Sequence, residues 1–375
     1  MKLLLTTLTF FLAFQLTAQI TLPPSGDNQQ SIVTQYMGAH AHVTVNYHSP
    51  DVTGPNGQDR RGHIWGELVP FGLTDLGFGL REPAPWRAGA NENTVISFSH
   101  DVAVEGQPLP AGDYGLHLIV RENEPWTVIF SHNASAWGSF FYRPEEDALR
   151  VDVSPVAHEY TEWLTYEFTD RQRDACTLAL RWEEIELPIH IAVPNNTALH
   201  LDYIRGELEN EEGFMWQNFV TAVNYCLTEN TNLEEALGWA ETAISTPFIG
   251  QRNFTTLSAK AQVLMQLERM DEAQATLAEA IAHPTADPFQ IHGVGRQLIS
   301  QGHAAQAMKI FQANYDRFDG AWPTEVGMAR GLSALGEYAK AAEHARIALT
   351  QAPDDLNRGS LEQMIQMLSE GKDVN

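Results

Sequence analysis

Cysteine and positive charge are what this sequence has least of. Its 375 residues include two cysteines, too few for the disulfide framework that stabilises small secreted domains. Lysine and arginine number 23 against 48 aspartate and glutamate residues, so the formal net charge is −25. A nucleic-acid binder needs a basic surface that displaces counterions, and anionic membranes attract basic segments. The charge therefore argues against nucleic acids and against adhesion to anionic membranes.

Catalytic and cofactor motifs are also missing. The chain has no G-x-S-x-G nucleophile elbow, no H-E-x-x-H or C-x-x-C metal motif, no Walker loop and no dinucleotide-binding fingerprint. Gly293 and Gly295 fall inside a helical pattern, where they predict close helix packing rather than a phosphate-binding loop. The sequence therefore predicts no cofactor, and it identifies no reaction.

Apolar material is plentiful, because hydrophobic residues make up 43% and aromatic residues 10% of the chain. This is enough for folded cores, and the length is typical of two domains. One apolar run, Leu3 to Leu16, follows Lys2 and precedes the small residue Ala18. That order is typical of a secretory signal peptide, and the run is shorter than the roughly 20 residues of a spanning helix. We therefore predict a signal peptide over residues 1–18. We expect export to the periplasm, the cell surface or the medium, with no membrane insertion after cleavage.

Residues 31–193 alternate between apolar and polar side chains with a period of two, which is typical of strands. The clearest apolar rows are Tyr114–Val120, Trp126–Phe130, Leu149–Val153, Leu164–Phe168 and Leu178–Trp182. No helical pattern intervenes, so we expect antiparallel pairing. The pattern predicts an antiparallel, jelly-roll-like β-sandwich of about nine short strands.

After Pro194 the apolar period changes to 3.6, which is typical of helices. Four similar segments align at Ala236, Ala273, Ala307 and Ala341, with spacings of 37, 34 and 34 residues. A period of 34 residues in helix–turn–helix units resembles the tetratricopeptide repeat, or TPR. Gly302 and Gly336 fall at the expected turns, and residues 356–369 predict an amphipathic closing helix.

The helical half therefore predicts a linker over 194–212 and an α-solenoid of about four TPR-like helix pairs over 213–370. An irregular helical bundle is the alternative. Stacked repeats usually present a groove that holds an extended peptide or a partner's helix. We expect a protein or peptide partner there, unless the repeats serve only to dock onto the sandwich and stabilise it.

Several blocks of the strand region occur in the order typical of one family. They are GHIWGELVPFG (62–72), PWRAGANENTVISFSHDVAVEGQPLPAGDYGLHLIV (85–120), WTVIFSHNASAWGSFFY (126–142), LRVDVSP (149–155) and ALRWEEIELPIHI (179–191). They resemble the bacterial domain-of-unknown-function 2911 family, which is common in Bacteroidetes and often exported. The resemblance implies a fold and export but no activity. The residues TDLGFGLREPA (74–84) form an apparent insertion into these blocks. If the residues that flank it line a site, we expect the insertion to cover or narrow that site.

The densest polar block runs from Trp86 to Glu92 and combines an aromatic ring, a cation, an amide and a carboxylate. The donors of Arg87 and Asn91 beside Trp86 suit a carbohydrate or a carboxylate ligand. Alternatively, Arg87 and Glu92 form an ion pair that fastens the loop to the sandwich. A catalytic Glu92 would need a second carboxylate for glycoside hydrolysis, and the sequence identifies none.

Two further aromatic residues and one histidine pair complete the candidate site residues. Trp65 and Trp137 each neighbour a glycine in or near a loop, so either could offer a stacking surface. His40 and His42 are spaced to share one strand face, and such a pair binds a metal when a third ligand joins it. Scattered histidines without a metal are the alternative, and we predict no metal.

Together these observations predict an exported two-domain β + α protein with a binding or scaffolding function and no enzymatic activity. The sandwich is expected to bind a small or glycan-like ligand, and the repeats a protein partner. Two alternatives stay open at this point. One is an envelope or extracellular hydrolase that uses Glu92, and the other is a metal-binding sandwich that uses His40 and His42.

Overall fold

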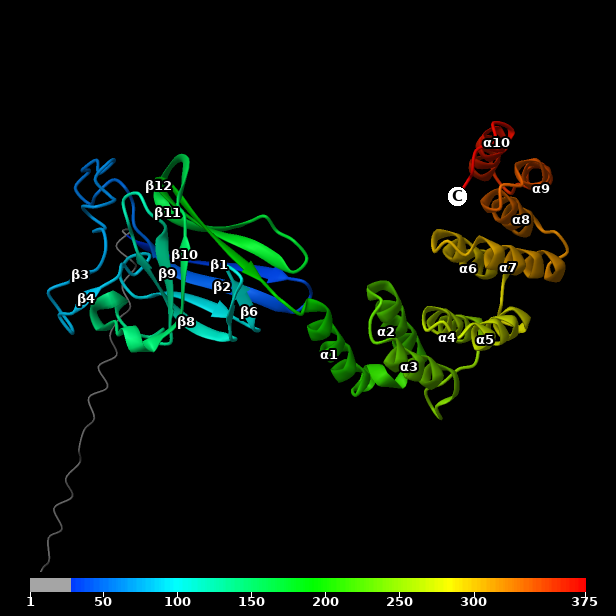
Figure 1. Ribbon diagram of the computed structural model, residues 1–375, viewed down its shortest axis with the longest axis horizontal. Helices are drawn as coiled ribbons and strands as arrows, with labels where there is room; N and C mark the ends of the chain where they lie inside the picture. Colours follow the sequence, from blue (N-terminus) through cyan, green and yellow to red (C-terminus); the bar gives the residue numbers. More distant parts are fainter. Residues whose placement is uncertain (1–27) are drawn as a thin grey trace, which may run out of the picture. The chain divides into compact units, whose positions relative to one another are not determined.

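The structure is a computed structural model that describes residues 28–375 (Figure 1). The predicted signal peptide, residues 1–18, lies outside the described residues. The chain divides into two compact units, the first ending at His200 and the second running from Leu201 to Asn375. No helix within residues 28–375 combines the length and the apolar character needed to cross a membrane.

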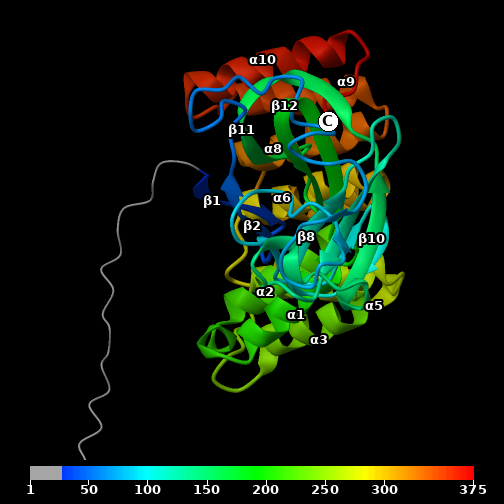
Figure 2. The same cartoon turned by 90° about the vertical axis from the view of Figure 1, so that its left-hand side faces the viewer.

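The N-terminal unit is built from antiparallel sheets (Figure 1). The larger sheet has the strand order β1-β2-β5-β8-β9-β10, with β1 (Gln29–Met37), β2 (Ala41–Ser49), β5 (Thr94–Phe98), β8 (Gly112–Ile119), β9 (Trp126–Ser131) and β10 (Asp147–Val153). The smaller has the order β11-β12-β6-β7, with β6 (Val102–Val104), β7 (Gln107–Leu109), β11 (Val156–Thr169) and β12 (Ala175–Ala192). A separate pair joins β3 (Thr74–Asp75) to β4 (Pro83–Ala84). Figure 2 shows β1 and β10 on opposite sides of this unit.

The alternating residues of both sheets meet in one core, which confirms the predicted sandwich. Leu116 and Leu118 of β8, with Tyr166 of β11 and Leu180 of β12, are among its fully buried members. Residues 28–375 form twelve strands rather than about nine. The extra ones are strands of two or three residues, which are too short to produce a period-two pattern.

The C-terminal unit is a run of helices joined by short turns. They are α1 (Asn196–Leu208), α2 (Trp216–Glu229), α3 (Leu233–Ser245), α4 (Phe254–Gln266), α5 (Met270–Ala282), α6 (Pro288–Ser300), α7 (Ala304–Arg317), α8 (Trp322–Ala334), α9 (Tyr338–Thr350) and α10 (Asp355–Ser369). The pairs α2–α3, α4–α5, α6–α7 and α8–α9 are the four predicted repeats, and α10 is the predicted closing helix. The first helices of neighbouring pairs lie side by side, α2 with α4 and α6 with α8 (Figure 1).

Part of the expected linker is helical, because α1 falls within residues 194–212. Leu199 packs against the sandwich core, whereas Leu201 is buried in the core of the first repeat. Two residues within one turn of α1 therefore belong to different apolar clusters.

The predicted glycine positions behave differently from one another. Gly302 and Gly336 have φ of +84° and +78°, as turns between the paired helices require. Gly295 lies directly against the ring of Phe311, which confirms the close helix packing expected there. The same expectation was wrong for Gly293, because an added Cβ there meets nothing within 4 Å.

Candidate functional site

The N-terminal unit has a cavity of about 400 Å³ that contains the predicted Trp86 block. Its walls come mainly from the 50–60 loop, the 68–76 stretch and the 84–91 loop, and Ser139 and Trp182 add to them. We call it the Trp86 cavity, and its defining residues include Asp51, Arg60, Thr74, Leu76, Trp86, Arg87, Asn91, Ser139 and Trp182. Three of the predicted ligand-binding residues, Trp86, Arg87 and Asn91, therefore share one wall.

Trp86 is fixed by the backbone of the large sheet. Its N–H donates to the carbonyl of Leu118 at 2.9 Å, and its carbonyl accepts from Leu118 N–H at 2.8 Å. Its ring stacks on Trp182 with centroids 5.9 Å apart and planes at 20°, and it meets Trp65 edge-on at 5.7 Å. Trp65 also packs on Trp126 and Trp182, so it supports the wall and is not among the residues that line the cavity. Trp182 belongs to the sandwich core and also contributes to the lining.

The loop after Trp86 is held in an unusual conformation. Ala88 and Asn91 have φ of +52° and +57°, a region that costs free energy for residues with a side chain. The carbonyl of Ala88 accepts hydrogen bonds from Tyr166 Oη at 2.8 Å and Thr94 Oγ1 at 3.0 Å. At Gly89 an added Cβ would lie 2.6 Å from Thr94 Oγ1, so only glycine fits. Buried hydroxyls thus hold the loop.

Arg87 extends from this loop into a half-buried position. Its Nη1 donates to the backbone carbonyl of Asn91 at 2.5 Å, and its guanidinium carbon lies 4.9 Å from the centre of the Phe140 ring. An added Cβ at Gly138 would come within 2.5 Å of the guanidinium. Burial lowers the pKa of Arg87, and no carboxylate of residues 28–375 forms an ion pair with it.

Glu92 does not pair with Arg87. Its Oε2 lies 3.2 Å from Nε2 of His48 on β2, and its side chain is 48% exposed. It is not among the residues that line the cavity. The expected Arg87–Glu92 ion pair is therefore not what fastens the loop, because hydrogen bonds to the Ala88 carbonyl do so. This position also gives no support to Glu92 as a catalytic acid or base at the cavity.

Ser139 and His117 form a buried polar pair behind Arg87. His117 is 2% exposed, and its Nδ1 lies 2.9 Å from Ser139 Oγ. Burial and, to a lesser extent, the charge of Arg87 lower the pKa of His117 to about 3. The imidazole is therefore neutral at physiological pH, and Arg87 carries the positive charge at this wall. The sequence pointed to Trp137 nearby but not to Ser139.

The remaining predicted features of this unit lie in different places. Trp137 is 54% exposed and is not part of the cavity lining. The 74–84 insertion contributes Thr74, Leu76 and Ala84 to the wall, and its Leu80 N–H donates to the carbonyl of Phe140 at 3.0 Å. The insertion therefore lines the same cavity as Arg87.

The histidine pair is divided between a turn and a strand. His40 precedes β2, and its Nε2 lies 3.1 Å from Nδ1 of His200, whereas His42 belongs to β2 and contacts the ring of Tyr36. Their expected shared strand face is therefore wrong. Within residues 28–375, no three or more His, Cys, Asp or Glu side chains are grouped to hold a metal ion. The metal-binding alternative lacks the third ligand it requires.

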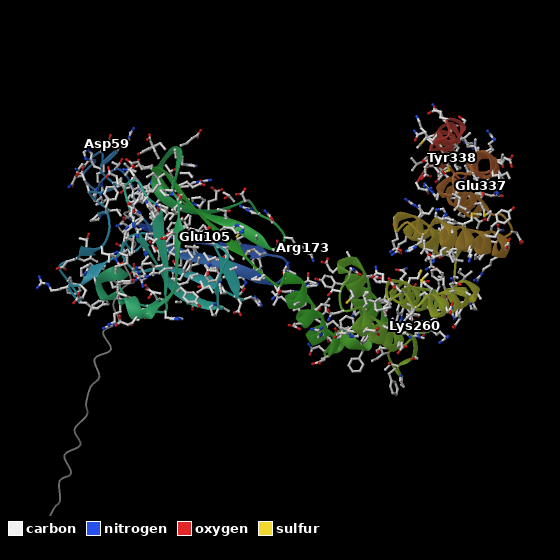
Figure 3. The ribbon with its side chains drawn as sticks, viewed as in Figure 1. Asp59, Glu105, Arg173, Lys260, Glu337 and Tyr338 are labelled. Atoms are coloured by element: carbon white, nitrogen blue, oxygen red, sulfur yellow. The ribbon has the colours of Figure 1, made fainter. Side chains whose placement is uncertain are left out.

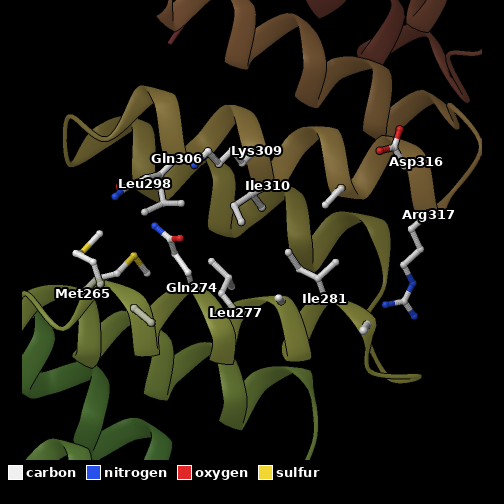
Figure 4. Close-up of a pocket in the computed structure, with 15 residues that line it drawn as sticks. Met265, Gln274, Leu277, Ile281, Leu298, Gln306, Lys309, Ile310, Asp316 and Arg317 are labelled. Atoms are coloured by element: carbon white, nitrogen blue, oxygen red, sulfur yellow. The ribbon is translucent and has the colours of Figure 1, made fainter.

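The helical unit has two grooves of contrasting chemistry. The first, of about 580 Å³, lies on α2, α4 and α6, and its polar residues include Asn224, Gln262, Gln266, Gln290, Gln297 and Gln301. The second, of about 630 Å³, lies between α5 and α7 (Figure 4). Figure 4 shows Leu277 and Ile281 of α5 facing Ile310 of α7 and Leu298 of α6 across it. The first groove can hydrogen-bond a peptide backbone, whereas the second is mainly apolar and has Lys309, Asp316 and Arg317 among its lining residues.

Comparison with protein families agrees with the division of the chain into two units. Residues 28–191 match the family model described as protein of unknown function, DUF2911. The resemblance inferred from the sequence blocks is thereby confirmed for the N-terminal unit. No protein of curated function matches the chain.

Solved structures similar to part of this chain include tetratricopeptide-repeat proteins. One is YrrB, a TPR protein with an unusual peptide-binding site, at 16% identity, covering 45% of this chain and 90% of that one, with a TM-score of 0.27. Another is a tetratricopeptide-repeat protein from Parabacteroides merdae, at 14% identity, 47% and 70% coverage and a TM-score of 0.29. A third is a thermophilic TPR protein of Thermus thermophilus, at 17% identity, 46% and 92% coverage and a TM-score of 0.31. The assignment of TPR-like repeats rests on the helix pairs and their spacing.

Proposed function

We propose that this is an exported binding and scaffolding protein without enzymatic activity. TPR-like repeats are typical of protein-binding scaffolds, because their stacked helices expose long grooves. In the proposal, the β-sandwich holds a small, glycan-like ligand in the Trp86 cavity, and the helical unit holds a protein partner.

The ligand site is supported by one observation above all. A cavity of about 400 Å³ combines the aromatic ring of Trp86 with the amide of Asn91 and the cation of Arg87, which forms no ion pair with a carboxylate of the described residues. Small-molecule sites are typically about 300–1,000 Å³, largely apolar, with a few polar groups that orient the ligand. A sugar matches this mixture, since its ring has an apolar face and its hydroxyls need hydrogen-bond partners.

The partner site is supported by the amide-rich groove on α2, α4 and α6. Asn224, Gln262 and Gln297 contribute amide side chains, which can both donate to and accept from the backbone of an extended peptide. Gln297 Nε2 donates to Gln262 Oε1 at 3.2 Å, which leaves the Gln262 N–H groups and the Gln297 carbonyl for a peptide. The groove lies on the first helices of successive pairs, so a single extended segment can contact several repeats. Export is supported by the composition of residues 1–18. N-terminal sequencing of the exported protein is expected to begin at Gln19.

A thermal-shift experiment on the full chain tests the ligand site. Mono- and oligosaccharides are expected to raise the melting temperature of the wild-type protein, because a ligand that binds only the folded state stabilises it. Trp86→Ala should abolish the shift, while Trp137→Ala should keep it, since Trp137 is exposed outside the cavity. A blank screen, or equal shifts in both variants, would contradict binding at Trp86.

Crosslinking in the cell envelope tests the partner site. A double variant, Gln262→Arg with Gln297→Arg, places two long cations in the amide-rich groove and should lose the partner recovered with the wild type. Gln312→Arg, compared with each single variant as well, adds one such cation at an exposed position of α7 outside both grooves and should retain the partner. Equal recovery of the partner by both variants would contradict binding in the groove.

A further inference from the structure

The Trp86 cavity carries a positive charge that no residue of the described chain neutralises. Among its described lining residues, three are ionisable: Asp51, Arg60 and Arg87. Arg60 Nη2 lies 3.6 Å from Asp51 Oδ1, so these two charges compensate each other. Arg87 has no counterpart, which leaves the lining with an excess of one positive charge. The chain as a whole carries −25, and acidic side chains such as Asp59 and Glu105 are spread over the same unit (Figure 3).

A half-buried arginine without a carboxylate is costly unless a ligand pairs with it. Burial lowers the pKa of Arg87, yet guanidinium remains protonated in proteins, so the charge persists in the cavity wall. The hydrogen bond to Asn91 uses one of the five N–H donors of the side chain. The planar fork of the guanidinium matches a carboxylate in two parallel hydrogen bonds.

The polar residues near Arg87 do not occupy the position that a ligand carboxylate would take. Glu92 is directed to His48 and so does not compete for Arg87. His117 is buried and neutral, so it adds no second cation. The 86–92 loop is held in its strained conformation at Ala88 and Asn91 by buried hydrogen bonds, which pre-organises the guanidinium before any ligand arrives.

We propose that the Trp86 cavity selects an acidic sugar unit, a uronic acid, whose carboxylate pairs with Arg87 while its ring lies against Trp86. Asp51 and Asn91 in the same lining supply an acceptor and a donor for the sugar hydroxyls. This inference rests on the proposed glycan-binding function and narrows it to a ligand class.

Isothermal titration of the full chain distinguishes the possible ligands. The probes are glucuronate, its uncharged methyl ester, glucose and glucose 6-phosphate. Glucuronate is expected to bind roughly tenfold to a hundredfold more tightly than glucose or the ester, because a hydrogen-bonded ion pair is added. Arg87→Met should remove that difference without abolishing weak glucose binding. Arg87→Lys should restore part of it, since lysine keeps the charge but lacks the planar fork.

Two controls separate this result from general effects. Arg143→Met removes the same charge from an exposed arginine of the same unit, and it should leave the preference for glucuronate unchanged. Near-ultraviolet circular dichroism confirms that each variant is folded.

The outcomes separate the inference from the proposed function. Equal binding of glucose and glucuronate, or a preference that survives in Arg87→Met, would overturn the uronic-acid inference while leaving glycan binding intact. Tighter binding of glucose 6-phosphate than of glucuronate would overturn it in favour of a phosphate. If none of the four sugars binds, the proposed ligand site fails as well.

Discussion

Replacing Gly295 by alanine should destabilise the helical unit, whereas the same change two residues earlier should stabilise it. An added Cβ at Gly295 would lie 2.5 Å from Cζ of Phe311, whose ring is fully buried. The ring cannot move aside, because Gly327 and Gly331 of α8 approach it just as closely. Gly293 on the same helix is exposed, with open space where its Cβ would be.

The magnitudes follow from two opposing effects. Alanine is more favourable than glycine in a helix interior by about 1 kcal/mol, so Gly293→Ala should raise the free energy of unfolding by about that amount. Overpacking a core costs about 1–3 kcal/mol, so Gly295→Ala should lower the free energy of unfolding by up to about 2 kcal/mol after the helix gain is subtracted.

Urea unfolding followed by circular dichroism at 222 nm measures the difference, since the helical unit dominates that signal. With a slope of about 2 kcal/mol per molar urea, each kcal/mol moves the midpoint by about 0.5 M. The two variants should shift the midpoint in opposite directions with little change in slope. A midpoint for Gly295→Ala at or above the wild-type value would refute the argument that Phe311 is confined by glycines.

Three further predictions concern titration, thiol reactivity and helix capping. The pKa of His117 is about 3 in the folded unit against about 6.5 in the unfolded chain, so the unfolded state takes up the proton first and the free energy of unfolding falls as the pH drops below 6.5. The loss from this residue is about 2 kcal/mol at pH 5. In urea unfolding followed by tryptophan fluorescence, the free energy of unfolding of His117→Gln should therefore decrease less between pH 7.5 and pH 5 than that of the wild type. Burial raises the pKa of Cys176 and Cys226 to about 11, so a thiol reagent at pH 8 should react with neither until urea unfolds the chain, and rapid labelling of the native protein would contradict this. Asp287 accepts the backbone N–H groups of Phe289 and Gln290 at the start of α6, so Asp287→Ala should cost about 1 kcal/mol in the urea titration while Asp287→Asn retains most of the stability.

Much of the architecture was predictable from the period of the apolar residues. Alternation along residues such as Leu116, Leu118 and Leu180 places them on the inner faces of the sandwich, because side chains on a strand point to opposite sides in turn. The spacing of Ala236, Ala273, Ala307 and Ala341 places one small, buried side chain at the same position of each second helix. Both the alternation and the spacing are local patterns. Each repeats often enough that a few residues departing from it do not change the prediction.

The candidate site was predictable only in part. The composition of the 86–92 block pointed to Trp86, Arg87 and Asn91, which do line one cavity. The role of Trp65 was not predictable, because its contacts with Trp126 and Trp182 join segments that lie far apart in the chain. For the same reason Asp51, Arg60 and Ser139 were missed, since no local motif distinguishes them from other loop residues.

The sequence by itself determined the order of the two units, the sandwich and the repeats, because these follow from short-range periodicity and from turn residues such as Gly302 and Gly336. Only the tertiary structure decided the charge pairs and the close contacts. It directed Glu92 to His48, gave Arg87 no carboxylate partner among residues 28–375, and confined Phe311 between glycines of α6 and α8. These contacts depend on which distant segments of the chain pack against each other, and the periodicity of the sequence does not predict that.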